Sequence, residues 1–232
     1  MRLTVTFTWR IDGPLHVGDG MSRAGYADRL VRKRDGSLIL PGDAVKGAIR
    51  GSAERLAAWL LAQQGLSPAE EREDHSVPRN RVVERIFAPL ELPGAGACYR
   101  FRPGKAEGKP RTIAATQIDD DSGVADDDTL RIIEVAPRGL TFDLGIQGWG
   151  GAWDDETSRD RDDLLFLGAA ILAADGIGGK RGIGCGRIVC EQIDLGVAGV
   201  TRDHLCSWEV VGKLSKHLAG NDGSDRLRRL RN

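Results

Sequence analysis

An abrupt change from strand to helix around residues 40–50 constrains the fold more than any other stretch of the chain. A short apolar run ends at Leu40, a Pro-Gly turn follows, and apolar residues then recur at helical spacing. Asp43 is placed to cap this helix, because its carboxylate can accept a hydrogen bond from a free backbone N–H. The stretch predicts a strand that leads directly into a long helix, which ends near Gly65.

Two cations lie just inside the start of this helix. Lys46 and Arg50 are four residues apart and therefore share one face. Free backbone N–H groups at a helix start attract anions, and two neighbouring cations suit a phosphate. An ordinary strand-to-helix junction with solvated cations explains the same residues, and the stretch taken alone favours that explanation.

Length and composition indicate a globular protein. The chain has 232 residues, of which 41% are hydrophobic, so it can form a full core as one large domain or two small ones. No apolar run is long enough to span a membrane, and Arg2 with alternating threonines interrupts any signal-peptide pattern. We therefore expect a cytoplasmic protein without membrane contact. The four cysteines include no Cys-x-x-Cys pair, so we expect reduced thiols.

Charge is distributed unevenly, although the net charge is only −1. Residues 1–60 hold ten Lys/Arg against six Asp/Glu, whereas residues 115–163 hold four Arg against fourteen acids. This asymmetry predicts one basic face and one acidic projection, with chance imbalance as the alternative. The acids at 119–128 lack the spacing of a calcium loop, so a solvated loop tip explains them best.

Period-two alternation predicts the strands. It is clearest in residues 3–9, where threonines alternate with apolar residues and should face outward. The other stretches with strand character are 97–102, 132–135, 140–144 and 187–193. We expect 132–135 to pair with 140–144 around the turn at residues 137–139. A helix rich in small residues is predicted at 164–174, and Thr201 is placed to cap a further helix.

A glycine-rich loop, residues 176–186, follows that helix and precedes the strand at 187–193. This order is the reverse of the one in dinucleotide-binding and P-loop motifs, so neither is predicted. The loop contains Gly178, Gly179, Lys180, Arg181 and Gly182, a run that can press its backbone against a phosphodiester chain. A flexible connector is the competing explanation.

These motifs together resemble the RAMP superfamily of CRISPR-associated proteins. Residues 41–50 read Pro-Gly-x-x-x-Lys-Gly-x-x-Arg, and residues 178–186 read Gly-Gly-Lys-Arg-Gly-x-Gly-x-Gly. Leu15-His16-Val17-Gly18 looks like the exit of that family's first strand, and Ile118-Asp119 before Gly123 is similar to the element preceding its thumb hairpin. The match within the family is to the repeating backbone subunit of type III, Csm/Cmr-like effector complexes. The chain departs from the pattern at Leu30 (family Pro) and Asp120 (family Arg).

The resemblance implies an α+β fold with a ferredoxin-like core of RNA-recognition type. Helices would cover one face of an antiparallel sheet, and a thumb hairpin would be inserted. One RAMP domain would span 1–232, with a thumb-type insertion at about 103–130, a polar insertion at 147–163 and a basic tail at 219–232. Copies of the chain would stack along a CRISPR guide RNA with other effector subunits, and would engage the paired target RNA.

The resemblance also implies roles for single residues. His16, Arg23, Lys46, Arg50 and the run Gly178–Gly182 would contact the guide backbone, independently of sequence because phosphates are bound. Asp28 lies in the position of the family's target-cutting loop. An aspartate there would act as a base, or would hold Mg²⁺ or another divalent cation near the phosphate.

Several alternatives stay open. Asp19 and Asp35 are rival carboxylates in the same loop region. The chain can also be a structural guide-binding subunit that does not cut, which Leu30 in place of the family proline makes reasonable. A third function is a guide-processing endoribonuclease, for which His16 and Tyr26 are the early candidates.

Overall fold

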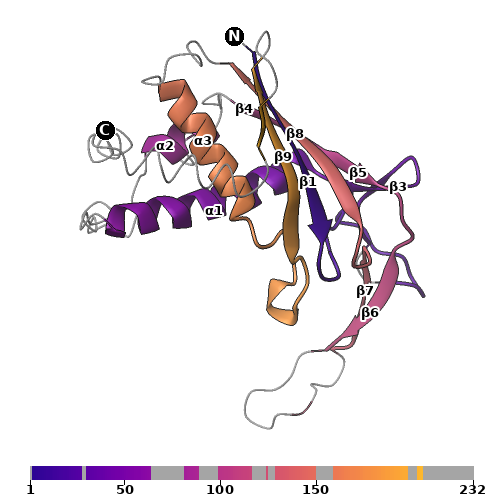
Figure 1. Cartoon of the computed structure of the whole chain (residues 1–232). Helices are drawn as coiled ribbons and strands as arrows, with labels where there is room; N and C mark the ends of the chain where they lie inside the picture. Colours follow the sequence, from indigo (N-terminus) through magenta and orange to yellow (C-terminus); the bar gives the residue numbers. More distant parts are fainter. Residues whose placement is uncertain are drawn as a thin grey trace.

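A five-stranded antiparallel sheet forms the centre of the protein (Figure 1). The computed structural model describes residues 2–27, 30–63, 81–88, 99–116, 124, 129–149, 159–197 and 203–205. The strands of this sheet are β1 (Arg2–Ile11), β4 (Tyr99–Arg102), β8 (Thr141–Trp149), β9 (Ile188–Val197) and β10 (Asp203–Leu205). They lie in the order β10-β9-β1-β8-β4, and every neighbouring pair is antiparallel.

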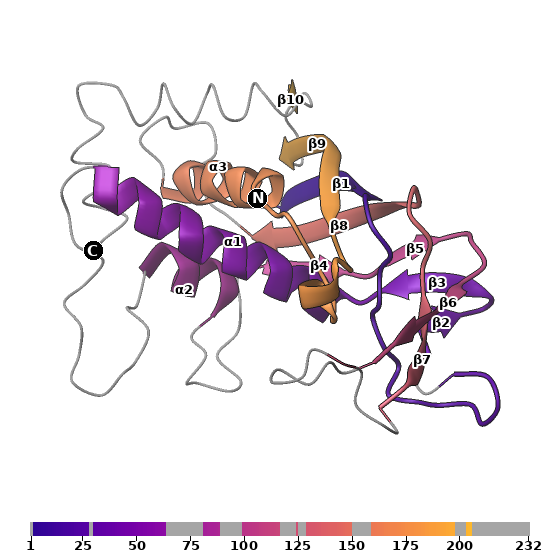
Figure 2. The ribbon, with the colours of Figure 1, turned by 90° about the horizontal axis from the view of Figure 1, so that it is seen from below.

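Helices cover one face of this sheet (Figures 1 and 2). In the described part of the chain they are α1 (Gly42–Gln63), α2 (Arg81–Phe87) and α3 (Arg159–Leu172). The chain order β1-α1-β4-β8-α3-β9 with the sheet order β9-β1-β8-β4 is the ferredoxin-like βαββαβ arrangement. The predicted α+β fold, with an antiparallel sheet and helices on one face, is therefore confirmed.

Strand β1 shows why this sheet forms. Its apolar side chains all lie under the helices, no more than 3% exposed: Leu3, Val5, Phe7, Trp9 and Ile11. The intervening threonines lie on the opposite face, as the alternation predicts. Each buried side chain of this size contributes about 1.5–3 kcal/mol relative to an exposed one, so a shift in register by one residue would be strongly unfavourable.

Helix α1 packs Val45, Ile49 and Ala53 against this core. It begins at Gly42, since the N–H of Val45 donates to the carbonyl of Pro41 at 3.1 Å and makes Pro41 the cap residue. Asp43 lies exposed in the first turn instead. The prediction that Asp43 caps the helix is therefore wrong. The predicted end near Gly65 lies outside the described residues.

Two smaller sheets complete the described fold. The first contains β2 (Lys33–Arg34), β3 (Ser37–Leu40) and β5 (Gly104–Ala106). The second is a two-stranded hairpin of β6 (Arg111–Ala115) and β7 (Arg131–Val135), which projects from the body at the bottom of Figure 1. The expected pairing of 132–135 with 140–144 is wrong. Strand β8 lies between β1 and β4, where the apolar side chains Phe142, Leu144 and Ile146 are buried.

The structure also fixes several boundaries. Residues 104–106 form β5, and of the hairpin only β6 lies within the expected 103–130 insertion, because β7 begins at Arg131. Residues 147–149 belong to β8 and residues 159–163 to α3. Residues 203–205 pair with β9 as a strand, so the expectation of a helix capped by Thr201 is wrong there. The basic tail at 219–232 and the acidic stretch, apart from Val124, lie outside the described residues.

The described residues bear on two expectations from composition, the absence of a membrane span and the reduced state of the thiols. No helix in this part of the chain is long and apolar enough to cross a membrane. Cys185 and Cys190 are free thiols. Burial raises the pKa of the Cys190 thiol to about 12, so this thiol stays protonated at neutral pH.

The contact between α1 and β4 generates a prediction about two glycines of α1. A Cβ on Gly42 would lie 2.3 Å from the carbonyl oxygen of Phe101, whereas one on Gly47 would meet nothing within 4 Å. We expect Gly42→Ala to lower the free energy of unfolding by about 1–3 kcal/mol through this overlap. Gly47→Ala should raise it by about 0.5–1 kcal/mol because alanine favours the helix. Urea denaturation measures both, and equal effects of the two substitutions would contradict the packing described here.

Candidate nucleic-acid interface

Three segments join the sheet at the same end of its central strands. Antiparallel pairing places Ile11, at the end of β1, opposite Ile188 of β9, and Arg10 opposite Thr141 of β8. Three connections therefore start or end here (Figure 1): the β1–β2 loop (residues 12–32), the glycine-rich loop (residues 176–186) and the segment between the hairpin and β8. The topology thus brings together stretches that are far apart in the sequence.

The glycine-rich loop is closed by its own backbone. The N–H of Ile177 donates to the carbonyl of Gly186 at 2.8 Å, and the tip is a 3₁₀ turn at Arg181–Ile183. Gly178 and Gly186 have φ angles of 83° and 81°, and a Cβ on either would clash with a carbonyl oxygen. Glycine is required at both positions because no other residue fits this backbone.

The glycines predicted to contact RNA divide into two groups. Gly178 packs against the carbonyl of His16, and the N–H of Gly179 donates to that same oxygen at 3.0 Å. Gly182 lies at the exposed tip, where a Cβ would meet no atom within 4 Å. Gly178 and Gly179 thus hold the loop against the β1–β2 loop, and Gly182 leaves open space at the tip.

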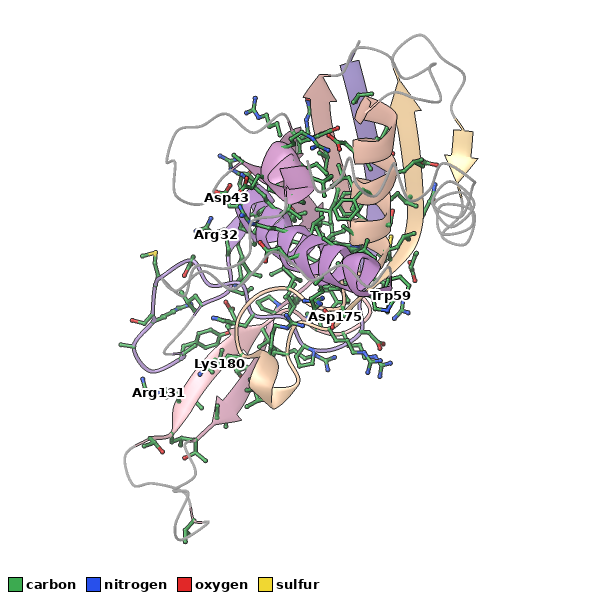
Figure 3. The ribbon with its side chains drawn as sticks, turned by 90° about the vertical axis from the view of Figure 1, so that its left-hand side faces the viewer. Arg32, Asp43, Trp59, Arg131, Asp175 and Lys180 are labelled. Carbon is green, nitrogen blue, oxygen red and sulfur yellow. The ribbon has the colours of Figure 1, made fainter. Side chains whose placement is uncertain are left out.

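The cations of this loop are exposed. The side chain of Lys180 makes no ion pair or hydrogen bond with the described residues. The Arg181 guanidinium, half exposed, lies 3.2 Å from the Asp175 carboxylate, which also pairs with Arg55 of α1 at 3.1 Å. Figure 3 looks onto this side of the molecule, with Lys180 and Asp175 labelled. Exposed ion pairs of this kind are weak, so a phosphate can take the place of the carboxylate.

The two cations of α1 have different surroundings. The Nε of Arg50 pairs with Glu54 at 2.9 Å, and another guanidinium nitrogen donates to the carbonyl of Ala88 at 2.9 Å. Arg50 thereby ties α1 to the residue that follows α2, and its side chain is only 15% exposed. Lys46 is half buried, and its ammonium has no ion pair within the described residues. RNA contact by either residue stays a prediction, but Arg50 also has a structural task.

His16 lies beneath the glycine-rich loop. Its ring is buried, and Nδ1 is 2.8 Å from the carbonyl oxygen of Glu134 on β7. A carbonyl oxygen only accepts hydrogen bonds, so Nδ1 carries the hydrogen and donates it. With its own carbonyl bonded to Gly179, His16 joins the hairpin to the glycine-rich loop. Its proposed RNA contact stays untested, while its position in the fold is internal.

The tip of the β1–β2 loop is an ordered turn. Arg23 and Ala27 exchange two backbone hydrogen bonds, with Gly25 at a φ of 71° between them. The Arg23 guanidinium stacks over the Tyr26 ring, 5.7 Å from its centroid, and the tyrosine is 43% exposed. The structure thus places Arg23 on an exposed surface, as a phosphate contact requires.

Asp28 lies outside the described residues, between Ala27 and Leu30. Its two rivals lie in turns. The Asp19 carboxylate accepts a hydrogen bond from the N–H of Met21 at 2.8 Å, and Asp35 occupies the β2–β3 turn at a φ of 53°. No cluster of three or more His, Cys, Asp or Glu side chains suited to a metal occurs among the described residues. The predictions of a catalytic Asp28 and of bound Mg²⁺ stay predictions.

The domain is predicted to have a core of RNA-recognition type. Such domains stack bases on aromatic rings of the central strands. Here Phe7, Trp9 and Phe142 of the central strands lie on the helix side, and Thr6, Thr8, Asp143 and Gln147 line the open face. The loops at this end of the central strands are therefore better candidates for the RNA interface than the open face of the sheet.

Two carboxylates near this end of the strands were not predicted from the sequence. One is Glu134, whose charged side chain interrupts an apolar strand, a pattern that signals a buried polar group. The other is Asp12, whose carboxylate accepts a 2.7 Å hydrogen bond from Arg138 and lies 3.6 Å from Arg187. The bond from Arg138 lowers the pKa of the Asp12 carboxyl. No sequence pattern links positions so far apart.

Comparison with known proteins identifies the family. The model of the RAMP superfamily matches residues 10–189, from the end of β1 to the start of β9. This range is more than half of the chain, so the protein belongs to the RAMP superfamily, whose members are CRISPR-associated RNA-binding subunits. No curated protein matches the chain by sequence.

The surroundings of the cations generate a prediction. Lys180→Ala should weaken binding to single-stranded RNA and reduce the salt dependence of the affinity by about one phosphate contact, with unchanged thermal stability. Arg50→Ala should lower the free energy of unfolding by about 1–3 kcal/mol, because the carbonyl of Ala88 loses a charged donor. Fluorescence anisotropy at several salt concentrations and thermal denaturation measure these effects. An unchanged RNA affinity of Lys180→Ala would remove Lys180 from the interface.

Proposed function

We propose that this chain is the repeating guide-binding backbone subunit of a type III, Csm/Cmr-like CRISPR effector complex, and that it cuts the paired target RNA through Asp28. The observation that best supports this function is a junction of two loops and the hairpin at one end of the central strands. There the β1–β2 loop is bonded to the glycine-rich loop through His16 and Gly179, and to β7 of the hairpin through Val31 and Glu134. The loop that contains Asp28, the glycine-rich loop and β7, the strand that follows the expected thumb-type insertion, thus meet at this junction.

Guide binding would use phosphate contacts. Lys180 and Arg181 lie exposed at the start of the 3₁₀ turn, and Arg23 lies exposed on the neighbouring loop. Contacts to phosphates carry no sequence information, which suits a protein that must accept guides of many sequences. Repetition of this grip in stacked copies would cover a long guide.

Cleavage would depend on geometry. A nucleotide displaced from the guide–target duplex can present its 2′-OH in line with the neighbouring phosphate, and such positioning supplies much of the rate enhancement. Attack of the 2′-oxygen on phosphorus would form a 2′,3′-cyclic phosphate and break the bond to the 5′-oxygen of the next nucleotide, which would leave as a hydroxyl with a proton from water. Asp28 would accept the proton of the 2′-OH, or would hold a divalent cation beside the phosphate. Mg²⁺ is the cation we propose, on the ground that carboxylate and phosphate oxygens are its preferred ligands.

The structure weighs against the guide-processing alternative. His16 is buried with its Nδ1 bonded to a backbone carbonyl, and the hydroxyl of Tyr26 donates to Glu134 at 3.3 Å. Both side chains have structural partners and are poorly placed to act as acid and base on an RNA. A structural subunit without cleavage would use the same grip, and it differs from our proposal only in the role of Asp28.

Substitution of Asp28 tests the proposed cleavage. In the assembled complex, Asp28→Ala should retain guide RNA and target binding, while target cleavage falls by about 100-fold or more through loss of the catalytic carboxylate. Asp19→Ala, which removes a carboxylate from the same loop, is the matched control and should still cut. Denaturing gels of labelled target RNA measure the rate, and regularly spaced fragments are expected from stacked copies. Cleavage by Asp28→Ala at the wild-type rate would leave the non-cutting subunit as the function.

Removal of divalent cations separates the two roles open to Asp28. Cleavage that stops in EDTA and returns with added Mg²⁺ is expected if the carboxylate holds a cation near the phosphate. Undiminished cleavage in EDTA would instead indicate that the aspartate acts as a base alone.

A further inference from the structure

A buried carboxylate joins the hairpin to the β1–β2 loop. Glu134 lies on β7 with only 1% of its surface exposed. Its carboxylate accepts hydrogen bonds from the N–H of Val31 at 2.9 Å, the ammonium of Lys33 at 2.8 Å and the hydroxyl of Tyr26 at 3.3 Å. A buried carboxylate requires such donors, because without them its desolvation would be strongly unfavourable.

The donors lie on both sides of residues 28 and 29 in the sequence. Tyr26 precedes these two residues, whereas Val31 and Lys33 follow them. The backbone carbonyl of Glu134 accepts a further hydrogen bond, from Nδ1 of His16 at the start of the same loop. One residue of the hairpin therefore holds the loop at three points and the first residue of β2 at a fourth.

Backbone hydrogen bonds within the loop connect these anchors to the rest of it. Its two arms are joined by backbone hydrogen bonds, from Arg32 to the carbonyl of Val17 at 2.8 Å and from Leu30 to that of Met21 at 3.0 Å. Toward the hairpin, the described backbone bonds are the pair between Leu15 and Ala136. Both views of the ribbon place the loop beside the hairpin (Figures 1 and 2). A shift of β7 would therefore move the arms that flank residues 28 and 29.

We propose that Glu134 is a positioning residue, which holds the loop containing Asp28 in register with the hairpin and so sets the cleavage geometry. This inference rests on the proposed function in one respect, namely that Asp28 is the residue that cuts. Glu134 itself needs no contact with RNA, because its carboxylate is already engaged by donors of the loop and of β2. Its effect is transmitted through Tyr26, Val31 and Lys33.

Hydrogen exchange in the purified protein tests the anchor without reference to activity. Glu134→Gln keeps the shape of the side chain but removes the charge that holds Lys33, so amides of residues 17–33 should exchange about tenfold faster or more. Lys33→Ala removes one donor, and it serves as the second variant if Glu134→Gln does not fold. Asp163→Asn is the matched control, since Asp163 is a second buried carboxylate that pairs with Arg85 at 3.0 Å and links α2 to α3.

The expected pattern is selective. Exchange should rise in the β1–β2 loop for Glu134→Gln, and near α2 and α3 for Asp163→Asn. Unchanged exchange of the loop in both Glu134→Gln and Lys33→Ala would overturn the proposal. Equal loop exchange in Glu134→Gln and Asp163→Asn would overturn it too, because the effect would then be one of global stability.

Single-turnover cleavage in the assembled complex tests the consequence. With saturating target, Glu134→Gln should cut on the order of 10- to 100-fold more slowly through misplacement of the loop. Its affinity for guide and target should change less than about threefold, because it makes no phosphate contact. Asp163→Asn should cut at the wild-type rate, and an equal loss in both variants would overturn the positioning role.

Asp28→Ala in the same assay keeps the two proposals distinguishable. If Asp28→Ala does not cut but Glu134→Gln cuts normally, the proposed function stands and the positioning role of Glu134 is wrong. If Asp28→Ala cuts normally, the proposed function is wrong, and the positioning role for cleavage is wrong with it. The exchange experiment then decides separately whether Glu134 anchors the loop.

Discussion

Burial of one face of β1 is the constraint on which the rest of the structure depends. The strand is hydrogen-bonded on both sides, to β8 and to β9, which come from the second half of the chain. Its apolar face is fixed under α1 and α3, so the register of both neighbours is fixed as well. The loops that bear the family's motifs join the same end of these strands, and their proximity follows from the register rather than from contacts of their own.

Much of the fold could be predicted because its signals are local and repeated. The alternation in residues 3–9 defines a strand with one buried face, and the Pro-Gly turn before Val45 marks the start of α1. Pairing could not be predicted in the same way. Residues 132–135 and 140–144 are both short and apolar, and nothing local shows that β7 joins β6 while β8 enters the central sheet.

The candidate site could be predicted by residue type more readily than by role. Lys180 and Arg23 are exposed as expected, whereas Arg50 supports the carbonyl of Ala88 and His16 lies inside the fold. Spacing along a helix places Lys46 and Arg50 on one face. It cannot show that the Arg50 guanidinium already donates a hydrogen bond to a backbone carbonyl that follows α2. Glu134 was detectable only as a charge within an apolar strand, and its donors come from a loop some hundred positions earlier in the chain.

The ion pairs of Asp175 have a consequence for selectivity. In the free protein this carboxylate already pairs with both Arg55 and Arg181, so an incoming phosphate must compete with an anion that is covalently part of the chain. A single small anion gains little from such an exchange, since it replaces one weak partner by another. A polyanion gains more, because it engages Lys180 and other cations at the same time and releases several counterions. If the surface binds RNA as proposed, Asp175 would thus act as a competing anion within the chain, one that favours long nucleic-acid strands over isolated anions.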